Sequence, residues 1–222
     1  MRAQMTIARA GLASLLAAVA LAAPVCQQDA LAQVTVPIGR FVVDARGVIA
    51  PYPEGNEVAV PRGLQAADLP ARGFGLQVGG DVFLVRWRVA TLGVGAHWLW
   101  TQGTQDPQTA EDGTTVGTET TTRMTAFSPQ VSLNFGSGRG WSYVSGGLGA
   151  TKRSVSSPTQ EEDGAWAPDL HVGGGARWIF ADHLGVGFDV RLHSTAAQDP
   201  GASTAGFPRT TKFTFAAGLS FH

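Results

Sequence analysis

The chain has 222 residues, with 16 Lys and Arg against 17 Asp and Glu and a formal net charge of −1. A near-neutral chain without an arginine-rich run lacks the basic surface of a nucleic-acid-binding protein, so no nucleic-acid partner is predicted. Its single cysteine excludes an intrachain disulfide framework.

The first segment, residues 1–32, is predicted to be a secretory signal peptide. Two arginines accompany an apolar run over about residues 10–25, and an A-x-A cleavage site, Ala30–Ala32, precedes Gln33. A lipid-modified Cys26 is the weaker alternative, because the preceding residue is larger than a lipidation site requires. The remaining chain fits one domain and lacks an apolar run of the roughly 18 residues that indicate a transmembrane helix.

Eight segments of the exported chain alternate apolar and polar residues. The clearest reads LGVGFDVRLH, residues 184–193, in which every second residue is aliphatic or aromatic. Period two indicates a β-strand with one apolar and one polar face. Segments of about ten residues match the length that a tilted strand needs to cross a bilayer. The predicted strands are 40–50, 73–84, 89–100, 125–135, 142–151, 169–180, 184–193 and 212–221.

The connections alternate in length, which indicates how the strands are joined. Long polar loops follow the odd-numbered strands and short turns follow the even-numbered ones. The long loops are about 51–72, 101–123, 152–167 and 195–210, and the short turns are Val85–Arg88, Gly136–Gly140 and Ala181–His183. This segregation predicts an all-β fold over 33–222: an eight-stranded antiparallel up-and-down transmembrane β-barrel with short periplasmic turns, long extracellular loops and both termini periplasmic.

Glycine predicts which face of each strand points inward. It clusters on the polar parity at Gly73, Gly75, Gly79, Gly93, Gly95, Gly147, Gly149, Gly173, Gly175, Gly185, Gly187 and Gly218, whereas the apolar parity carries only Gly47, Gly80, Gly146 and Gly174. Glycine within a strand often marks a close approach, and an eight-stranded barrel is barely wide enough for its interior side chains. The polar face is therefore predicted to line the lumen and the apolar face to contact lipid. A soluble lipocalin-like binder, with the apolar face inside, is the alternative fold.

Aromatic residues on the apolar parity favour the same assignment. They are predicted to form two interfacial girdles, with Phe74, Trp98, Trp100, Phe127 and Phe213 toward the long loops and Phe41, Phe135, Trp178, Phe180 and Phe221 toward the short turns.

The signal peptide, the eight alternating strands and the terminal KFTFAAGLSFH together resemble the OmpA-type small outer-membrane β-barrel family. The resemblance implies a Gram-negative-type outer membrane and recognition of the final phenylalanine by the barrel-insertion machinery. Two features depart from the family pattern. His222 follows Phe221, and no peptidoglycan-binding domain follows the barrel, so no cell-wall tethering is expected.

Charged residues on the predicted lumen face are the first candidate site. Asp44, Arg46, Asp189 and Arg191 are predicted to form an interior ion-pair network, because a narrow lumen tolerates charges that are paired. Further polar lumen residues are His97, Asp169, His171, Arg177 and His193. Such a network predicts a structural plug, and a gated proton or ion path is the alternative.

Histidines on neighbouring strands raise the possibility of a metal or catalytic site. Two histidines and a carboxylate, His171, His193 and Asp169, can ligate zinc, but hydrogen-bonded lumen filler is favoured. His193 and Ser194 are adjacent in sequence and therefore point to opposite faces of a strand, which prevents a shared proton. No catalytic residue, metal or cofactor is predicted, and an outer-membrane lipid-modifying enzyme or protease is the alternative.

The long loops are the last candidate, because they carry eleven acidic residues. These are Glu54, Glu57, Asp68, Asp106, Glu111, Asp112, Glu119, Glu161, Glu162, Asp163 and Asp199. They are expected to share divalent cations with lipopolysaccharide or to bind a surface ligand. The threonine-rich stretch 113–123 is expected to extend strands above the membrane. The predicted role is therefore structural or surface-interacting, as a monomer among outer-membrane lipids, with a narrow solute channel as the runner-up.

Overall fold

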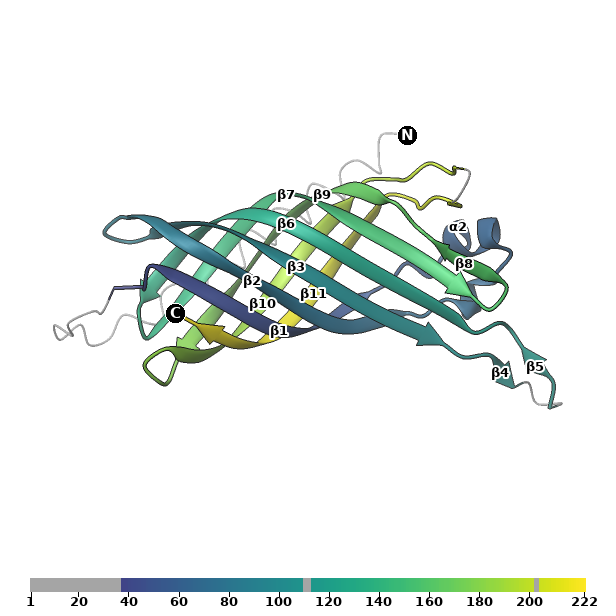
Figure 1. Cartoon of the computed structure of the whole chain (residues 1–222), viewed down its shortest axis with the longest axis horizontal. Coiled ribbons are helices and arrows are strands. Elements are labelled where there is room, and N and C mark those ends of the chain that lie inside the picture. The colour runs from purple at the N-terminus through teal and green to yellow at the C-terminus, as the bar shows by residue number, and fades with distance from the viewer. Residues whose placement is uncertain (1–36, 110–112, 202–203) are drawn as a thin grey trace, which may run out of the picture. The chain divides into compact units, whose positions relative to one another are not determined.

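The computed structural model describes residues 37–109, 113–201 and 204–222, which are mostly β-strand (Figure 1). The predicted signal peptide lies outside these residues. Eight long strands form the wall: β1 (Phe41–Pro51), β2 (Arg72–Arg86), β3 (Thr91–Gln105), β6 (Thr120–Ser137), β7 (Gly140–Ser157), β9 (Trp166–Ile179), β10 (Leu184–Thr195) and β11 (Thr210–Phe221).

The strands form a closed barrel in which sequence neighbours pair in antiparallel fashion. The sheet order is β6-β3-β2-β1-β11-β10-β9-β7, and an additional pairing between β6 and β7 closes the ring. The first and last strands pair with Val43 opposite Phe221. The predicted all-β, eight-stranded up-and-down barrel is confirmed.

The two faces of the wall have opposite chemistry. In β1, buried and exposed residues alternate strictly: Asp44 and Arg46 are 4% and 2% exposed, whereas Phe41 and Ile49 are 52% and 45% exposed. The apolar residues that alternate with the charges therefore cover the outer surface. Val186 and Phe188, which a lipocalin-like fold would bury, are both exposed, so the soluble alternative is wrong. The aromatic residues assigned to the two girdles are all exposed as well.

Several strands extend further than the sequence predicted. β6 and β7 each have 18 residues, and β6 begins at Thr120, within the threonine-rich stretch. Three short strands lie in the long loops: β4 (Gln108–Thr109) pairs with β5 (Thr115–Val116), and β8 (Gln160–Asp163) pairs with the end of β7. The third wall strand begins two residues later than predicted, at Thr91. A register shift between Phe83 and Val85 interrupts the regular pairing of β2 with β3.

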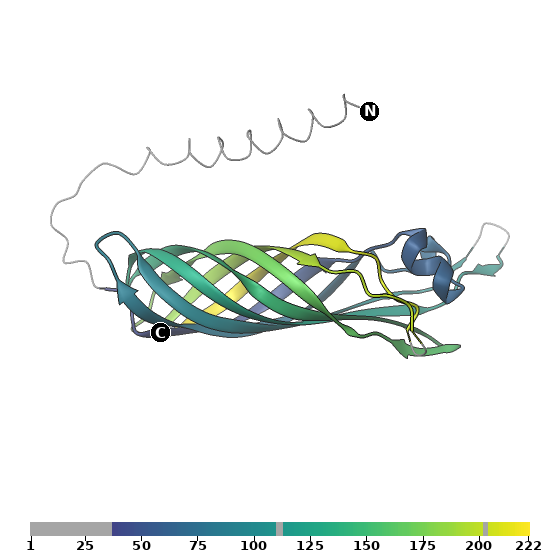
Figure 2. The ribbon, with the colours of Figure 1, turned by 90° about the horizontal axis from the view of Figure 1, so that it is seen from above.

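The first long loop contains a short helix, α2 (Asn56–Ala59), and two 3-10 turns, η1 (Val60–Arg62) and η2 (Ala66–Asp68). They lie at the end of the barrel opposite the C-terminus (Figure 2). Among the described residues, no helix has the length and apolar character needed to cross a membrane.

Candidate functional site

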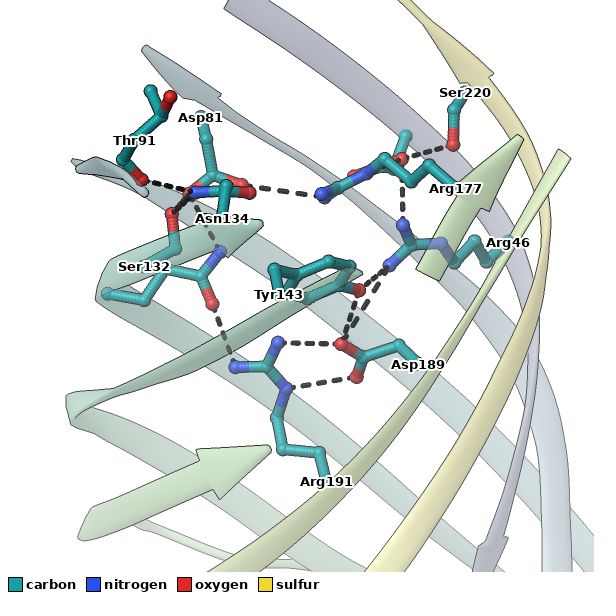
Figure 3. Close-up of polar contacts among 12 residues, drawn as sticks. Arg46, Asp81, Thr91, Ser132, Asn134, Tyr143, Arg177, Asp189, Arg191 and Ser220 are labelled. Atoms are coloured by element: carbon teal, nitrogen blue, oxygen red, sulfur yellow. Dashed lines mark hydrogen bonds and ion pairs between the residues drawn. The ribbon is translucent and has the colours of Figure 1, made fainter. Parts of the chain in front are cut away.

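Six charged side chains fill the middle of the lumen and define what we call the ionic layer. It consists of Asp44, Arg46, Asp81, Arg177, Asp189 and Arg191, each at most 4% exposed. Three arginines face three aspartates, so their formal charges cancel. The six side chains come from β1, β2, β9 and β10. The five that Figure 3 labels converge from different sides of the barrel.

Asp44 is the most heavily bonded carboxylate of the ionic layer. Arg177 donates from Nε and Nη2 to its two oxygens at 3.1 and 2.6 Å. Arg46 Nη2 lies 2.8 Å from Asp44 Oδ1, and Ser220 donates to the same oxygen at 2.6 Å. A fork-shaped pair of hydrogen bonds from an arginine is strong and fixes the relative orientation of the two groups. These contacts join β1, β9 and β11 across the barrel interior.

Asp189 is the second carboxylate of the ionic layer that accepts several hydrogen bonds. Arg191 donates to both of its oxygens at 3.1 and 3.0 Å. Tyr143 donates its hydroxyl hydrogen to Asp189 at 2.7 Å, and Arg46 donates to the Tyr143 hydroxyl at 3.1 Å. The guanidinium of Arg177 lies over the Tyr143 ring, 4.1 Å from its centroid. Tyr143 thus connects the two halves of the layer.

Asp81 closes the network on the remaining side. Arg177 Nη2 approaches it at 3.5 Å, and Gln130 Nε2 donates to its Oδ1 at 3.1 Å. The other end of the Gln130 amide accepts a hydrogen bond from Arg191 at 2.8 Å. The layer is therefore one continuous network in which each arginine contacts at least one aspartate directly.

The contacts extend the network predicted from sequence. The predicted quartet, Asp44, Arg46, Asp189 and Arg191, is joined by Arg177, which the sequence placed in the lumen without a partner. The sequence reasoning missed Asp81 as a network member. A signal was present, because Asp81 lies on the polar parity of the predicted strand 73–84.

Above the ionic layer, toward the long loops, three histidines lie close together. The ring centroids of His97 and His171 are 5.5 Å apart, and those of His171 and His193 are 5.9 Å apart. His193 Nδ1 lies 2.7 Å from Asp169 Oδ2, and Thr195 donates to the other Asp169 oxygen at 2.7 Å. In the described part of the chain, no three His, Cys, Asp or Glu side chains are arranged to hold a metal ion.

Apolar clusters border the polar lumen at both ends. Ile38, Val42, Phe83 and Trp141 form a buried cluster at the periplasmic end, where the Phe83 and Trp141 rings meet edge to face. Toward the loops, a second cluster contains Val48, Ala50, Tyr52, Leu99, Met124, Ala126 and Ala216. Beyond the ionic layer, the inner face therefore carries apolar residues as well as polar ones.

The long loops fold over the extracellular mouth into a structure that we call the cap. Its apolar centre consists of Val58, Ala59, Leu69, Val155 and Phe207. Arg62 and Arg153 stack on the Phe207 ring, with guanidinium carbons 4.2 and 4.8 Å from the ring centroid.

Among the described residues, hydrogen bonds and an ion pair hold the cap together. Arg62 forms an ion pair with Asp163 at 2.8 Å. Asp68 accepts hydrogen bonds from the backbone of Gln65 and Thr118, at 2.8 and 3.2 Å. These two aspartates, expected among the free acidic loop residues, are instead buried within the cap because their oxygens satisfy buried donors.

Comparisons with known proteins agree with this architecture. The family model described as Outer membrane protein beta-barrel domain matches residues 13–221. A search of curated proteins gave no match.

Solved structures of small barrels align with most of the chain. Neisserial surface protein A from Neisseria aligns with a TM-score of 0.51 at 12% identity, covering 82% of this chain and 97% of that one. Ail from Yersinia pestis, in complex with the heparin analogue sucrose octasulfate, aligns with a TM-score of 0.46 at 10% identity, over 82% and 95%. The N-terminal barrel of Pseudomonas aeruginosa OprF aligns with a TM-score of 0.43 at 11% identity, covering 82% of this chain and 96% of that one. The chain belongs to the outer-membrane β-barrel domain family and is an outer-membrane protein.

Proposed function

We propose that the protein is a closed, non-conducting barrel with a structural or surface-interacting role, which presents its capped loops outside the cell. The observation that carries this proposal is the charge-balanced ionic layer. Arg177 reaches across the lumen to Asp44 and Asp81. Arg46 and Arg191 each form an ion pair with the aspartate two residues before them on the same strand. Moving an ion through it would break several charge-assisted hydrogen bonds in a poorly solvated space. The apolar clusters on both sides support the same proposal, because they exclude water from the ends.

The surface-interacting part of the proposal rests on the loop acids that remain exposed. Glu54, Glu57, Asp106, Glu119 and Asp199 are all exposed around the mouth. Oxygen ligands of this kind bind divalent cations, and such cations can be shared with the phosphates of neighbouring lipopolysaccharide. The cap holds these residues on an ordered surface that can also meet a ligand.

Recordings in planar bilayers test the closed state directly. The wild-type protein is expected to show no steady conductance. The double variant Asp189→Ala/Arg191→Ala removes one positive and one negative charge together, so it keeps the layer neutral while opening space, and it is expected to leak ions. Steady open conductance of the wild-type protein would overturn the plug and favour a narrow channel.

An enzymatic role has no comparable support. His193 is buried in the lumen and Ser194 lies on the opposite, outward parity, so the adjacent pair does not form a nucleophile and its base. Hydrolysis of lipopolysaccharide or of a peptide, lost in His193→Ala, would reverse this conclusion.

A further inference from the structure

Lys212 is a buried cation that does not belong to the ionic layer. It belongs to β11, is 6% exposed, and its ammonium nitrogen has no hydrogen-bond partner in the structure. Its Cα pairs with that of His193, which in turn pairs with His171, so Lys212 lies at the level of the histidines. A buried ammonium without partners is costly, because it has lost its hydration without compensation.

A second cation lies beside it. Arg153 donates to the Thr210 hydroxyl at 2.5 Å and to the Pro208 carbonyl at 3.1 Å. Thr210 precedes Lys212 by two residues, so the two side chains lie on the same face of the strand. The Arg153 Nε is buried and also lacks a partner. Two neighbouring buried cations therefore present unused donors to the same region.

The local carboxylate does not neutralise both cations. Asp169 is the acidic group at this level, and its two oxygens are already engaged by His193 and Thr195. Among the described residues, the other buried acids are used elsewhere. Three belong to the ionic layer, Asp163 pairs with Arg62, and Asp68 binds backbone N–H groups in the cap. The level of Lys212 thus carries two formal positive charges against one negative charge.

We propose that a small inorganic anion binds at Lys212, beneath the cap, with the Lys212 ammonium and the Arg153 Nε–H as donors. Buried water can satisfy the donors but leaves the excess charge, whereas a monovalent anion satisfies both requirements. The same excess of positive charge disfavours a metal cation at the nearby histidines.

The cap predicts how the anion exchanges. Arg153 stacks on Phe207, which lies in the apolar centre of the cap, so the site is covered from outside. Entry requires the cap to open or the barrel to fold around the anion. Exchange is therefore expected to be slow in the folded protein, and the anion is best introduced during refolding.

Bromide is a suitable probe because it is small, monovalent and detectable by anomalous scattering. The wild-type protein is refolded from urea into detergent with sodium bromide as the salt, and it is then crystallised. An anomalous peak within hydrogen-bonding distance of Lys212 Nζ is expected in the wild-type crystals and absent from those of Lys212→Met. Wild-type crystals without density at this position would overturn the proposal.

Thermal melting provides an independent readout that does not depend on crystals. The melting temperature of the wild-type protein is expected to be higher after refolding in bromide than in gluconate, which is too large for the site, at equal ionic strength. Lys212→Met should lose this difference, and Lys212→Gln serves the same purpose if the methionine variant fails to refold. Lys152→Met, on the outward parity of β7, should retain it. Equal melting temperatures in both salts for the wild-type protein would contradict anion binding, whatever the bilayer recordings show.

Discussion

Replacing Arg177 with methionine tests whether the ionic layer stabilises the barrel through paired charges. Arg177 is 1% exposed, donates twice to Asp44 and lies 3.5 Å from Asp81. Methionine keeps much of the packing against Tyr143 but leaves three aspartates facing two arginines. Removing one partner of a buried ion pair typically costs about 3–5 kcal/mol, because the remaining charge stays buried without compensation. The free energy of unfolding should fall by about this amount.

The measurement is reversible urea unfolding in phospholipid vesicles, followed by tryptophan fluorescence. Arg139→Met is the matched control, since Arg139 is exposed in a short turn and its loss should change stability by less than about 0.5 kcal/mol. The double variant Arg177→Met/Asp44→Asn restores the charge balance and should be less destabilised than the single variant. A loss below about 1 kcal/mol for Arg177→Met would refute the reasoning, because the network would then not depend on pairing.

Three further predictions address the outer face, the network and the cap. Val186→Arg places a charge on the lipid-facing surface and should cost about 2–4 kcal/mol in the same vesicle assay, whereas Val60→Arg in the exposed loop should cost little. Tyr143→Phe removes a hydroxyl that bonds two charged groups and should cost about 1.5–3 kcal/mol; an unchanged unfolding midpoint would exclude this contribution. Phe207→Ala should cost the cap about 3 kcal/mol and make the long loops sensitive to limited proteolysis with the barrel intact; resistant loops would contradict the packing described for the cap.

The wall of the barrel could be predicted because its signal is local. In residues 184–193, the polarity of each side chain indicates which face of the strand it occupies. The strand β10, Leu184–Thr195, has the predicted inward and outward residues. The glycines on the polar parity were attributed to a close approach of neighbouring groups, and Gly175 shows such an approach. A Cβ at Gly175 would overlap the Phe188 carbonyl and approach the Tyr143 hydroxyl at 3.0 Å. A side chain on the inner face therefore has no room at this position, as the sequence indicated for Gly175.

The filling of the lumen could be predicted only in part. Strand parity placed Asp44 and Asp189 inside, but it contains no information on which arginine pairs with which aspartate across the barrel. Apolar residues on the inner parity, such as Leu99 and Met124, form a second layer in the lumen that was not predicted. Alternation shows which face of a strand a residue occupies, but it does not show which residues of different strands lie at the same level along the barrel axis. Their contacts join strands that are distant in sequence.

The cap was beyond sequence reasoning for a related reason. The loops were expected to be polar and acidic, and no periodic pattern marked Val58 or Phe207 as core residues. Their burial depends on residues of three long loops meeting in one cluster, which is fixed by barrel closure and not by any local preference. Asp163 illustrates the consequence, because a loop acid that composition assigns to solvent becomes the partner of the buried Arg62.

The arrangement of the interior follows from the solvent on each side of the wall. Lipid outside forces the polar residues inward, and a lumen only as wide as its side chains cannot hydrate them, so their charges must find one another. The apolar clusters at the two ends then strengthen these contacts, because excluding water lowers the local dielectric. The same low dielectric makes an unpaired charge expensive, which is why we place the proposed anion at Lys212, whose buried ammonium has no hydrogen-bond partner.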